Sequence, residues 1–234
     1  MGKKKPAKTA RKPLTRERVL RAACAMADRE GIENLSMRRL AQSLSVGTMS
    51  LYNHIADKNE LLAGILDVVL EEIELPEHQA DWRAAKRRSA ISTRAAFLRH
   101  PWAVELMGRE GATPVKLRFH DANLGHFRRA GFSVAMAVRA NAMLEGYIYG
   151  VALQSNARPS MAPDDYARQA ETMLAHLPAE AYPFIVETLS TLISASGFSY
   201  DDEFEFGLDI ILNALEPDEP MGHGDGPTIL TERI

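Results

Sequence analysis

The chain has 234 residues, of which 46% are hydrophobic and 25% are charged, as in an ordinary globular protein. Its one cysteine, Cys24, excludes an internal disulfide, and no apolar run reaches the roughly 20 residues that span a bilayer. The formal net charge of −3 favours no class of partner. The composition alone therefore predicts only a protein of the reducing cytoplasm.

The charge is distributed unevenly along the chain. Residues 1–60 contain 13 Lys and Arg against 6 Asp and Glu, whereas residues 61–234 contain 15 against 25. A basic first quarter on an acidic remainder places any surface that binds a polyanion near the N-terminus. The alternative is a basic tail that only aids solubility.

In chain order, the first predicted element is a disordered basic arm over residues 1–13, which is rich in Lys and Arg and almost free of apolar residues. Three helix starts follow it. Thr15 and Ser36 are residue types that cap a helix N-terminus, and Asp57 with Glu60 forms a variant of the capping box. These signals predict three of the helices in the N-terminal part of the chain.

Apolar residues at helical spacing continue beyond this part, and no segment alternates as a β-strand does. Further helices are predicted over residues 82–99, 115–130, 133–157, 164–177, 181–195 and 201–215, with a short restart at 101–102. The acidic, Gly- and Pro-rich residues 217–234 predict a disordered tail. The fold class is therefore all-α, with a helix-turn-helix domain over residues 14–60 and a larger helical domain over residues 61–216.

Residues 36–55 have the pattern of two helices that meet across a tight turn. Leu40, Leu44 and Leu51 supply apolar contacts between these helices. The outward-facing residues of the second helix are short, polar or flexible, as a helix in the DNA major groove requires: Thr48, Met49, Ser50, Asn53 and His54. This pattern predicts that the second helix reads base edges in double-stranded DNA.

Basic residues flank this second helix. Arg38 and Arg39 begin the preceding helix and Lys58 begins the following one, so their side chains and the free backbone N–H groups there can bind phosphate. The alternative is a basic three-helix subdomain with a structural role only.

The same residues resemble a known family. Residues 40–55 read LAQSLSVGTMSLYNHI, and residues 57–62 read DKNELL. Together these motifs resemble the DNA-binding domain of tetracycline-repressor-family transcriptional regulators, over residues 14–75. One position departs from the family pattern, because Ser45 stands where the turn usually has glycine. A left-handed backbone at Ser45 would add strain on the order of 1 kcal/mol.

The resemblance implies roles for individual residues. The positions that match base-contacting residues of the family are Thr48, Met49, Ser50 and Asn53. The positions that match residues contacting phosphate or holding the recognition helix are Tyr52, His54 and Lys58, while Arg38 matches a residue that grips a base or phosphate.

The second half of the chain resembles the tetracycline-repressor type of C-terminal domain, through residues 82–83, 99–102, 131–133 and 147–150. This resemblance implies a homodimer, formed by the last two long helices packing against their copies. It also implies a small-molecule effector that lies between the helices. The chain is thus expected to be a repressor that binds a palindromic operator and is released by its effector.

The candidate effector-contacting residues combine aromatic, Met and uncharged polar side chains: His100, Trp102, Leu106, Met107, Phe119, Asn123, Phe127, Met143, Tyr147 and Gln154. Each aromatic or Met residue could instead belong to the core. His100 matches an effector-contacting histidine of the tetracycline repressor, but Gly146 and Gln154 stand where that site has a histidine and a glutamate. A magnesium–tetracycline complex is therefore not the expected ligand.

No motif for catalysis, metal binding or a phosphate-binding glycine loop is present. We therefore expect no catalytic residue, no cofactor and no metal site. Two alternatives stay open: a ligand-independent DNA-binding protein and a transcriptional activator. A sizeable cavity in the structure would count against the first of them.

Overall fold

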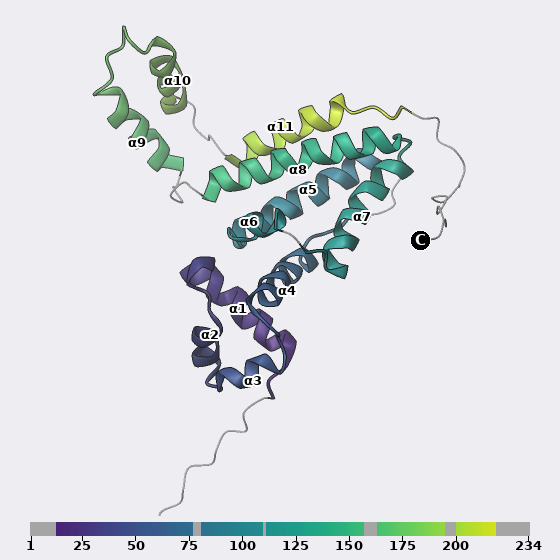
Figure 1. The fold of residues 1–234 in the computed structure, drawn as a ribbon. Coiled ribbons are helices and arrows are strands. Elements are labelled where there is room, and N and C mark those ends of the chain that lie inside the picture. Colours follow the sequence, from purple (N-terminus) through teal and green to yellow (C-terminus); the bar gives the residue numbers. More distant parts are fainter. Residues whose placement is uncertain (1–12, 77–80, 110, 157–162, 195–199, 219–234) are drawn as a thin grey trace, which may run out of the picture. The chain divides into compact units, whose positions relative to one another are not determined.

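The computed structural model describes residues 13–76, 81–109, 111–156, 163–194 and 200–218. Within these residues it contains helices and no β-strand, which confirms the predicted all-α fold class (Figure 1). None of the helices in this part of the chain is long and apolar enough to cross a membrane. Almost all of the predicted basic arm and most of the predicted tail lie outside the described residues.

The described chain divides into two compact units. The first takes in the residues up to 72 together with residues 99–117. Its elements are α1 (Arg16–Glu30), the 3-10 helix η1 (Ile32–Asn34), α2 (Met37–Leu44), α3 (Thr48–Tyr52), α4 (Lys58–Glu71), α6 (Ala103–Met107) and the first residues of α7 (Pro114–Arg129). Helix α1 packs against α2 and α4, and α3 packs against α2. This unit extends past residue 60, where the sequence placed a domain boundary.

Side-chain caps fix the starts of α1, α2 and α4, as the sequence predicted. Thr15, Ser36 and Asp57 each accept a hydrogen bond from the backbone N–H three residues further on, over 3.2, 3.3 and 2.8 Å. The Glu60 carboxylate in turn accepts from the N–H of Ala56 at 2.6 Å. The capping box is therefore reciprocal, with the returning bond one residue earlier than usual.

The turn between α2 and α3 contains the one described non-glycine residue with a positive φ. Ser45 has φ 54° and ψ 44°, which is the left-handed region. The N–H of Val46 donates to the carbonyl of Ala41 at 3.0 Å and closes the turn. The strain considered from the sequence is thus present in the structure.

Replacing Ser45 by glycine relieves this strain, so we expect the free energy of unfolding to rise by about 0.5 to 1 kcal/mol. Urea unfolding followed by circular dichroism measures the change. Ser43→Gly is the matched control, because Ser43 lies inside α2 and glycine there is expected to destabilise by about 1 kcal/mol. Equal destabilisation by both substitutions would contradict the strain at Ser45.

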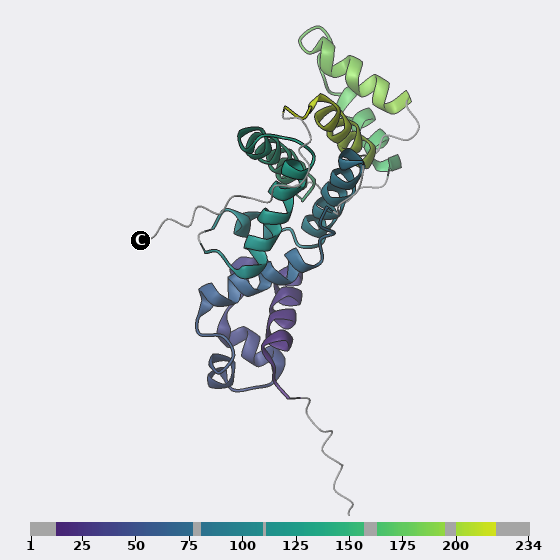
Figure 2. The same cartoon turned by 90° about the vertical axis from the view of Figure 1, so that its right-hand side faces the viewer.

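The second unit takes in residues 73–98 and the described residues from 118 onward. It contains α5 (Trp82–Arg99) apart from its last residue, most of α7, α8 (Val134–Asn156), α9 (Pro163–Leu174), α10 (Pro183–Ser194) and α11 (Tyr200–Ala214). Helices α8 and α11 pack together, as do α9 and α10 (Figures 1 and 2). These helices start and end within three residues of the bounds expected from the sequence.

Aromatic rings form the centre of the core in this unit. Phe127 and Phe132 are fully buried, and the Trp82 ring packs on both, with centroids 5.9 and 5.0 Å away. On α11, Phe204 and Leu208 are buried in the same cluster. The core therefore joins α5, α7, α8 and α11.

Ion pairs attach α11 to α5. The guanidinium of Arg87 donates to Glu205 at 2.5 Å and to Asp209 at 2.8 Å. Arg94 donates to Asp201 at 2.6 Å. With the aromatic core, these pairs fix which face of α11 is covered by its own chain.

Candidate DNA-binding surface and effector cavities

The short helix α3 is held by apolar side chains that point inward. Leu51 on α3 and Ile55 just after it are fully buried in the first unit. On the opposite side, Met49 is 76% exposed, and Tyr52 and Asn53 are also exposed. The helix therefore presents a free face, as a helix that enters a DNA groove must.

The structure brings the other predicted DNA-contacting residues to the same part of the unit. Thr48, Ser50 and His54 are half-buried in or directly after α3. Asn53 occupies the C-cap of α3, so it lies at the end of the helix and not in its middle. The contacts of these residues with DNA stay predictions.

The three predicted basic contacts differ from one another. Arg38 on α2 and Lys58 on α4 are exposed, and no ion pair is found for either in the described residues. Arg39, however, pairs with the Glu30 carboxylate and donates to the carbonyl of Asn34 at 3.2 Å. Arg39 therefore ties α2 to the end of α1 and to η1.

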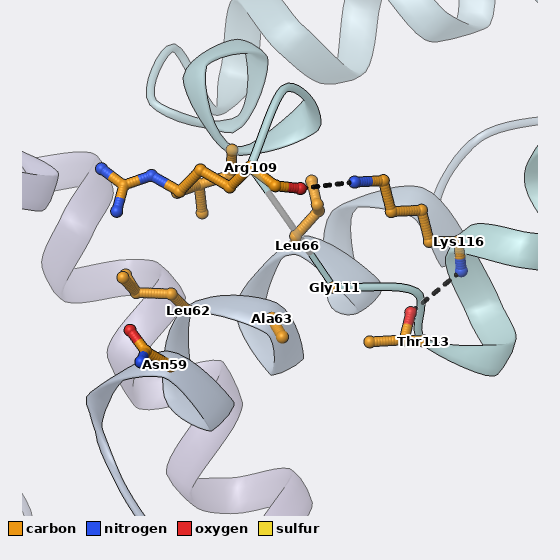
Figure 3. Close-up of a pocket in the computed structure, with 9 residues that line it drawn as sticks. Asn59, Leu62, Ala63, Leu66, Arg109, Gly111, Thr113 and Lys116 are labelled. Carbon is orange, nitrogen blue, oxygen red and sulfur yellow. Dashed lines mark hydrogen bonds between the residues drawn. The ribbon is translucent and has the colours of Figure 1, made fainter.

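One cavity lies within the first unit and has a volume of about 310 Å³. Helix α4 contributes Asn59, Leu62, Ala63 and Leu66 to its wall, and the opposite wall holds Arg109, Gly111, Thr113 and Lys116 (Figure 3). Leu106 of α6 completes the lining. Of the ten predicted effector contacts, Leu106 lines this cavity. Its size suits a small organic molecule.

The polar groups around this cavity are largely paired. The Lys116 ammonium donates to the carbonyls of Met107 and Arg109 at 2.9 and 3.1 Å. The hydroxyl of Thr113 donates to Asp67 at 2.5 Å. These bonds hold the segment between α6 and α7 in place beside α4.

A second cavity lies inside the second unit, between α5, α7 and α8. Its volume is about 10 Å³, which is room for about one water molecule. Its polar lining is formed by Lys86, Ser89, Thr93, Asn123, Asn141, Glu145 and Tyr149, and its apolar lining by Ala90, Phe119, Leu144 and Ile148. Phe119 and Asn123 were predicted from the sequence. The other polar residues were missed, although their spacing on α5 and α8 repeats at helical intervals.

Charged groups in this second cavity are strongly affected by burial. Lys86 is only 3% exposed, and burial lowers the pKa of its ammonium to about 7 against the opposing attraction of Glu145. Burial alone would raise the pKa of Glu145, but hydrogen bonds from His120 and Asn141 outweigh it and lower this pKa. The cavity therefore holds a carboxylate beside an ammonium that burial has destabilised.

Several predicted effector residues lie elsewhere. Phe127 belongs to the aromatic core, and Tyr147 stacks on Phe204 while its hydroxyl donates to the Phe204 carbonyl at 3.0 Å. Met143 and Gln154 are exposed on α8, and Met107 is buried on α6. None of these five is among the residues that line the two cavities.

His100 and Trp102 surround a carboxylate within the first unit. Nδ1 of His100 lies 2.8 Å from Asp28 Oδ1, and the indole N–H of Trp102 donates to the same oxygen at 2.7 Å. The Cys24 sulfur lies 4.0 Å from Nδ1 of His100, and burial, with the charges of Asp28 and Glu72, raises the pKa of this thiol to about 12. This group holds α1 to α6, and neither ring lines the cavities described above.

Comparisons with known proteins agree with this architecture. Residues 19–65 match the family described as bacterial regulatory proteins, tetR family, and residues 75–218 match the tetracyclin repressor-like C-terminal domain. The chain is 34% identical to the HTH-type transcriptional repressor DrrR1 of Streptomyces coeruleorubidus, over 91% of this chain and 81% of that protein. It is 29% identical to the class C tetracycline repressor protein of Escherichia coli, over 87% of this chain and 91% of that protein.

Solved structures show the same arrangement of helices. Apo ActR from Streptomyces coelicolor has a TM-score of 0.71 at 30% identity, over 87% of this chain and 95% of that one. ActR in complex with actinorhodin has a TM-score of 0.69 at the same identity, over 86% of this chain and 96% of that one. The chain therefore belongs to the tetR family of bacterial regulatory proteins and carries a tetracycline-repressor-like C-terminal domain.

Proposed function

We propose that this regulator is a homodimeric repressor that binds a palindromic operator through α3 and releases it when a small molecule binds. The observation that carries the proposal is α3 itself, which two buried side chains anchor while Met49, Tyr52 and Asn53 stay exposed. A related protein, DrrR1, is described as a repressor, which supports the direction of the regulation.

The surface of α11 supports the homodimer. Phe206 and Ile210 are 66% and 54% exposed, four residues apart on the side of α11 that does not face its own core. Because the two side chains are neighbours on one helix face, they form an exposed apolar surface that a second copy of the chain would cover. In such a dimer, two α3 helices held about 34 Å apart would enter successive major grooves of a palindromic site.

Two observations support a small-molecule effector. ActR, which is 30% identical to this chain, has been solved with actinorhodin and with (S)-DNPA. The cavity of about 310 Å³ beside α4 counts against a ligand-independent protein, which would not need such a space. An effector that favours one arrangement of the dimer lowers operator affinity through its differential affinity for the two arrangements.

Selection of bound sequences from random DNA tests the first part of the proposal. We expect enrichment of an inverted repeat whose half-sites are centred one helical turn apart. The selected duplex then serves in a fluorescence-anisotropy assay, in which small molecules that lower its affinity are effectors. Enrichment of no sequence, or of single half-sites bound by monomers, would contradict the proposal.

Two neighbouring arginines provide a sharper test of the DNA-binding surface. Arg38→Ala should weaken operator binding about tenfold and reduce the slope of log affinity against log salt by about one, without changing stability. Arg39→Ala removes the links to Glu30 and Asn34, so it should lower the free energy of unfolding by about 1 kcal/mol. Anisotropy titrations at several salt concentrations and urea unfolding measure both effects. An unchanged slope in Arg38→Ala would exclude a phosphate contact there.

A further inference from the structure

The buried ammonium of Lys86 has no carboxylate within hydrogen-bond reach in the described residues. Its hydrogen-bond partner is the neutral amide oxygen of Asn123, at 2.5 Å, and its other close neighbour is the ring of Phe127, with Nζ 4.9 Å from the centroid. Asn123 is itself fixed, because its amide nitrogen donates to the Phe119 carbonyl at 2.8 Å. The positive charge is thus held in one place by neutral groups.

Glu145 balances the charge of Lys86 only in part. Its Oε1 is buried and lies 3.4 Å from Nδ1 of His120, and Asn141 supplies a hydrogen bond to the carboxylate. If Glu145 neutralised Lys86, the pKa of the ammonium would stay near its ordinary value, but burial lowers it to about 7. The cavity therefore contains a cation whose charge its surroundings leave only partly balanced.

Another polar group at this cavity is also left without a partner. The hydroxyl oxygen of Tyr149 is buried, and no hydrogen bond to it is found in the described part of the chain. Burying unpaired polar groups and charges opposes folding, and a methionine and a phenylalanine at positions 86 and 149 would fill the same space without that penalty. The fold does not need these two polar groups, so a ligand is the natural explanation for them.

From these contacts we propose that the cavity between α5, α7 and α8 recognises an acidic small molecule. Its carboxylate or ionised phenol would bind Lys86 Nζ, a neighbouring oxygen would pair with Tyr149 Oη, and its apolar ring system would lie against Phe119 and Ile148. This inference rests on the proposed function, because it assigns a chemical class to the effector. It places the effector in the second unit and not in the larger cavity beside α4.

The small size of the cavity means that it must expand before a ring system can bind. A space of about 10 Å³ admits water but no ring system, so the walls formed by α5, α7 and α8 must move apart when such a molecule enters. A ligand that binds only the expanded arrangement shifts the population toward it. Binding at this position is therefore coupled to the arrangement of the helices, as release of an operator requires.

Matched pairs of probes test the proposal on the full chain. We choose 1-hydroxy-2-naphthoate and anthraquinone-2-carboxylate, each with its methyl ester, and measure binding by isothermal titration calorimetry at pH 6.5. At least one acid should bind 10-fold or more tightly than its ester. Lys86→Met should remove this preference, and Tyr149→Phe should weaken binding of that acid several-fold.

Lys116→Met is the matched control, because Lys116 lines the cavity in the first unit and should leave the preference for the acid unchanged. The proposal is overturned if neither acid binds, if the ester binds as well as the acid, or if the preference survives Lys86→Met. Loss of the preference in Lys116→Met would instead place the anion in the first unit and also overturn it.

Anisotropy with the selected operator separates this inference from the proposed function. Acids that bind through Lys86 without releasing the operator support the inference and contradict effector release. Release of the operator by the neutral esters, with affinity unaffected by Lys86→Met, supports effector release and contradicts the inference.

Discussion

Lys86→Met should raise the free energy of unfolding by about 2 kcal/mol at pH 6. The fall of the Lys86 pKa from 10.5 to about 7 corresponds to about 5 kcal/mol of destabilisation, at about 1.36 kcal/mol per pKa unit. Methionine has a similar volume and needs no hydrogen bond. The substitution also leaves Asn123 Oδ1 without its hydrogen-bond donor. This loss costs about 1 to 3 kcal/mol and offsets part of the gain in stability.

The pH dependence of this effect has a definite sign. A lysine whose pKa is lowered by folding destabilises the folded state. The destabilisation is complete at a pH below the pKa of the folded state, about 7, and it disappears as the pH rises to the unperturbed pKa of 10.5. The advantage of Lys86→Met over the wild-type chain should therefore be largest at pH 6 and shrink by pH 9. Urea unfolding at both pH values measures it. A variant that is less stable than wild type at pH 6 would show that Lys86 supports the fold.

The second large effect concerns the exposed side of α11. Replacing Phe206 and Ile210 together by glutamate should convert the protein to monomers at micromolar concentration and weaken operator binding at least about 100-fold, because four like charges would meet at a dimer interface. Sedimentation velocity and anisotropy measure the two results. Both side chains are exposed in the single chain, so helix content should not change.

Leu117→Glu provides the control for this experiment. Leu117 is a large exposed apolar residue in the first unit, and a charge there should leave the dimer intact. A dimer that persists in the α11 variant would place the interface elsewhere, and a variant that is monomeric yet binds the operator normally would contradict binding as a dimer.

Local sequence signals predicted the fold well. The caps at Thr15, Ser36 and Asp57 and the turn at Ser45 depend on residues within a few positions of one another, so sequence order determines them. Proline and glycine positions placed most helix ends within a few residues. The free face of α3 followed from the same local pattern, because Leu51 and Ile55 mark its buried side.

The cavities could not be predicted in the same way. Lys86, Asn123 and Glu145 lie on three helices that are far apart in the sequence, and their meeting depends on how each helix is rotated in the bundle. The spacing of apolar residues identifies the buried face of a helix, but it does not identify which other helix packs against that face. The sequence therefore indicated large aromatic residues such as Phe127 and Tyr147, which pack in the core, and apart from Asn123 it missed the buried polar residues of the cavity.

The burial of Cys24 has a practical consequence for labelling chemistry. It is the sole cysteine of the chain, it is buried, and its pKa is raised to about 12, so almost no thiolate is present at neutral pH. Maleimide reagents should leave it unmodified in the folded protein. A cysteine introduced at the exposed position of Met49 would then be the single reactive thiol, and a dye attached there would report the approach of α3 to DNA without replacement of Cys24.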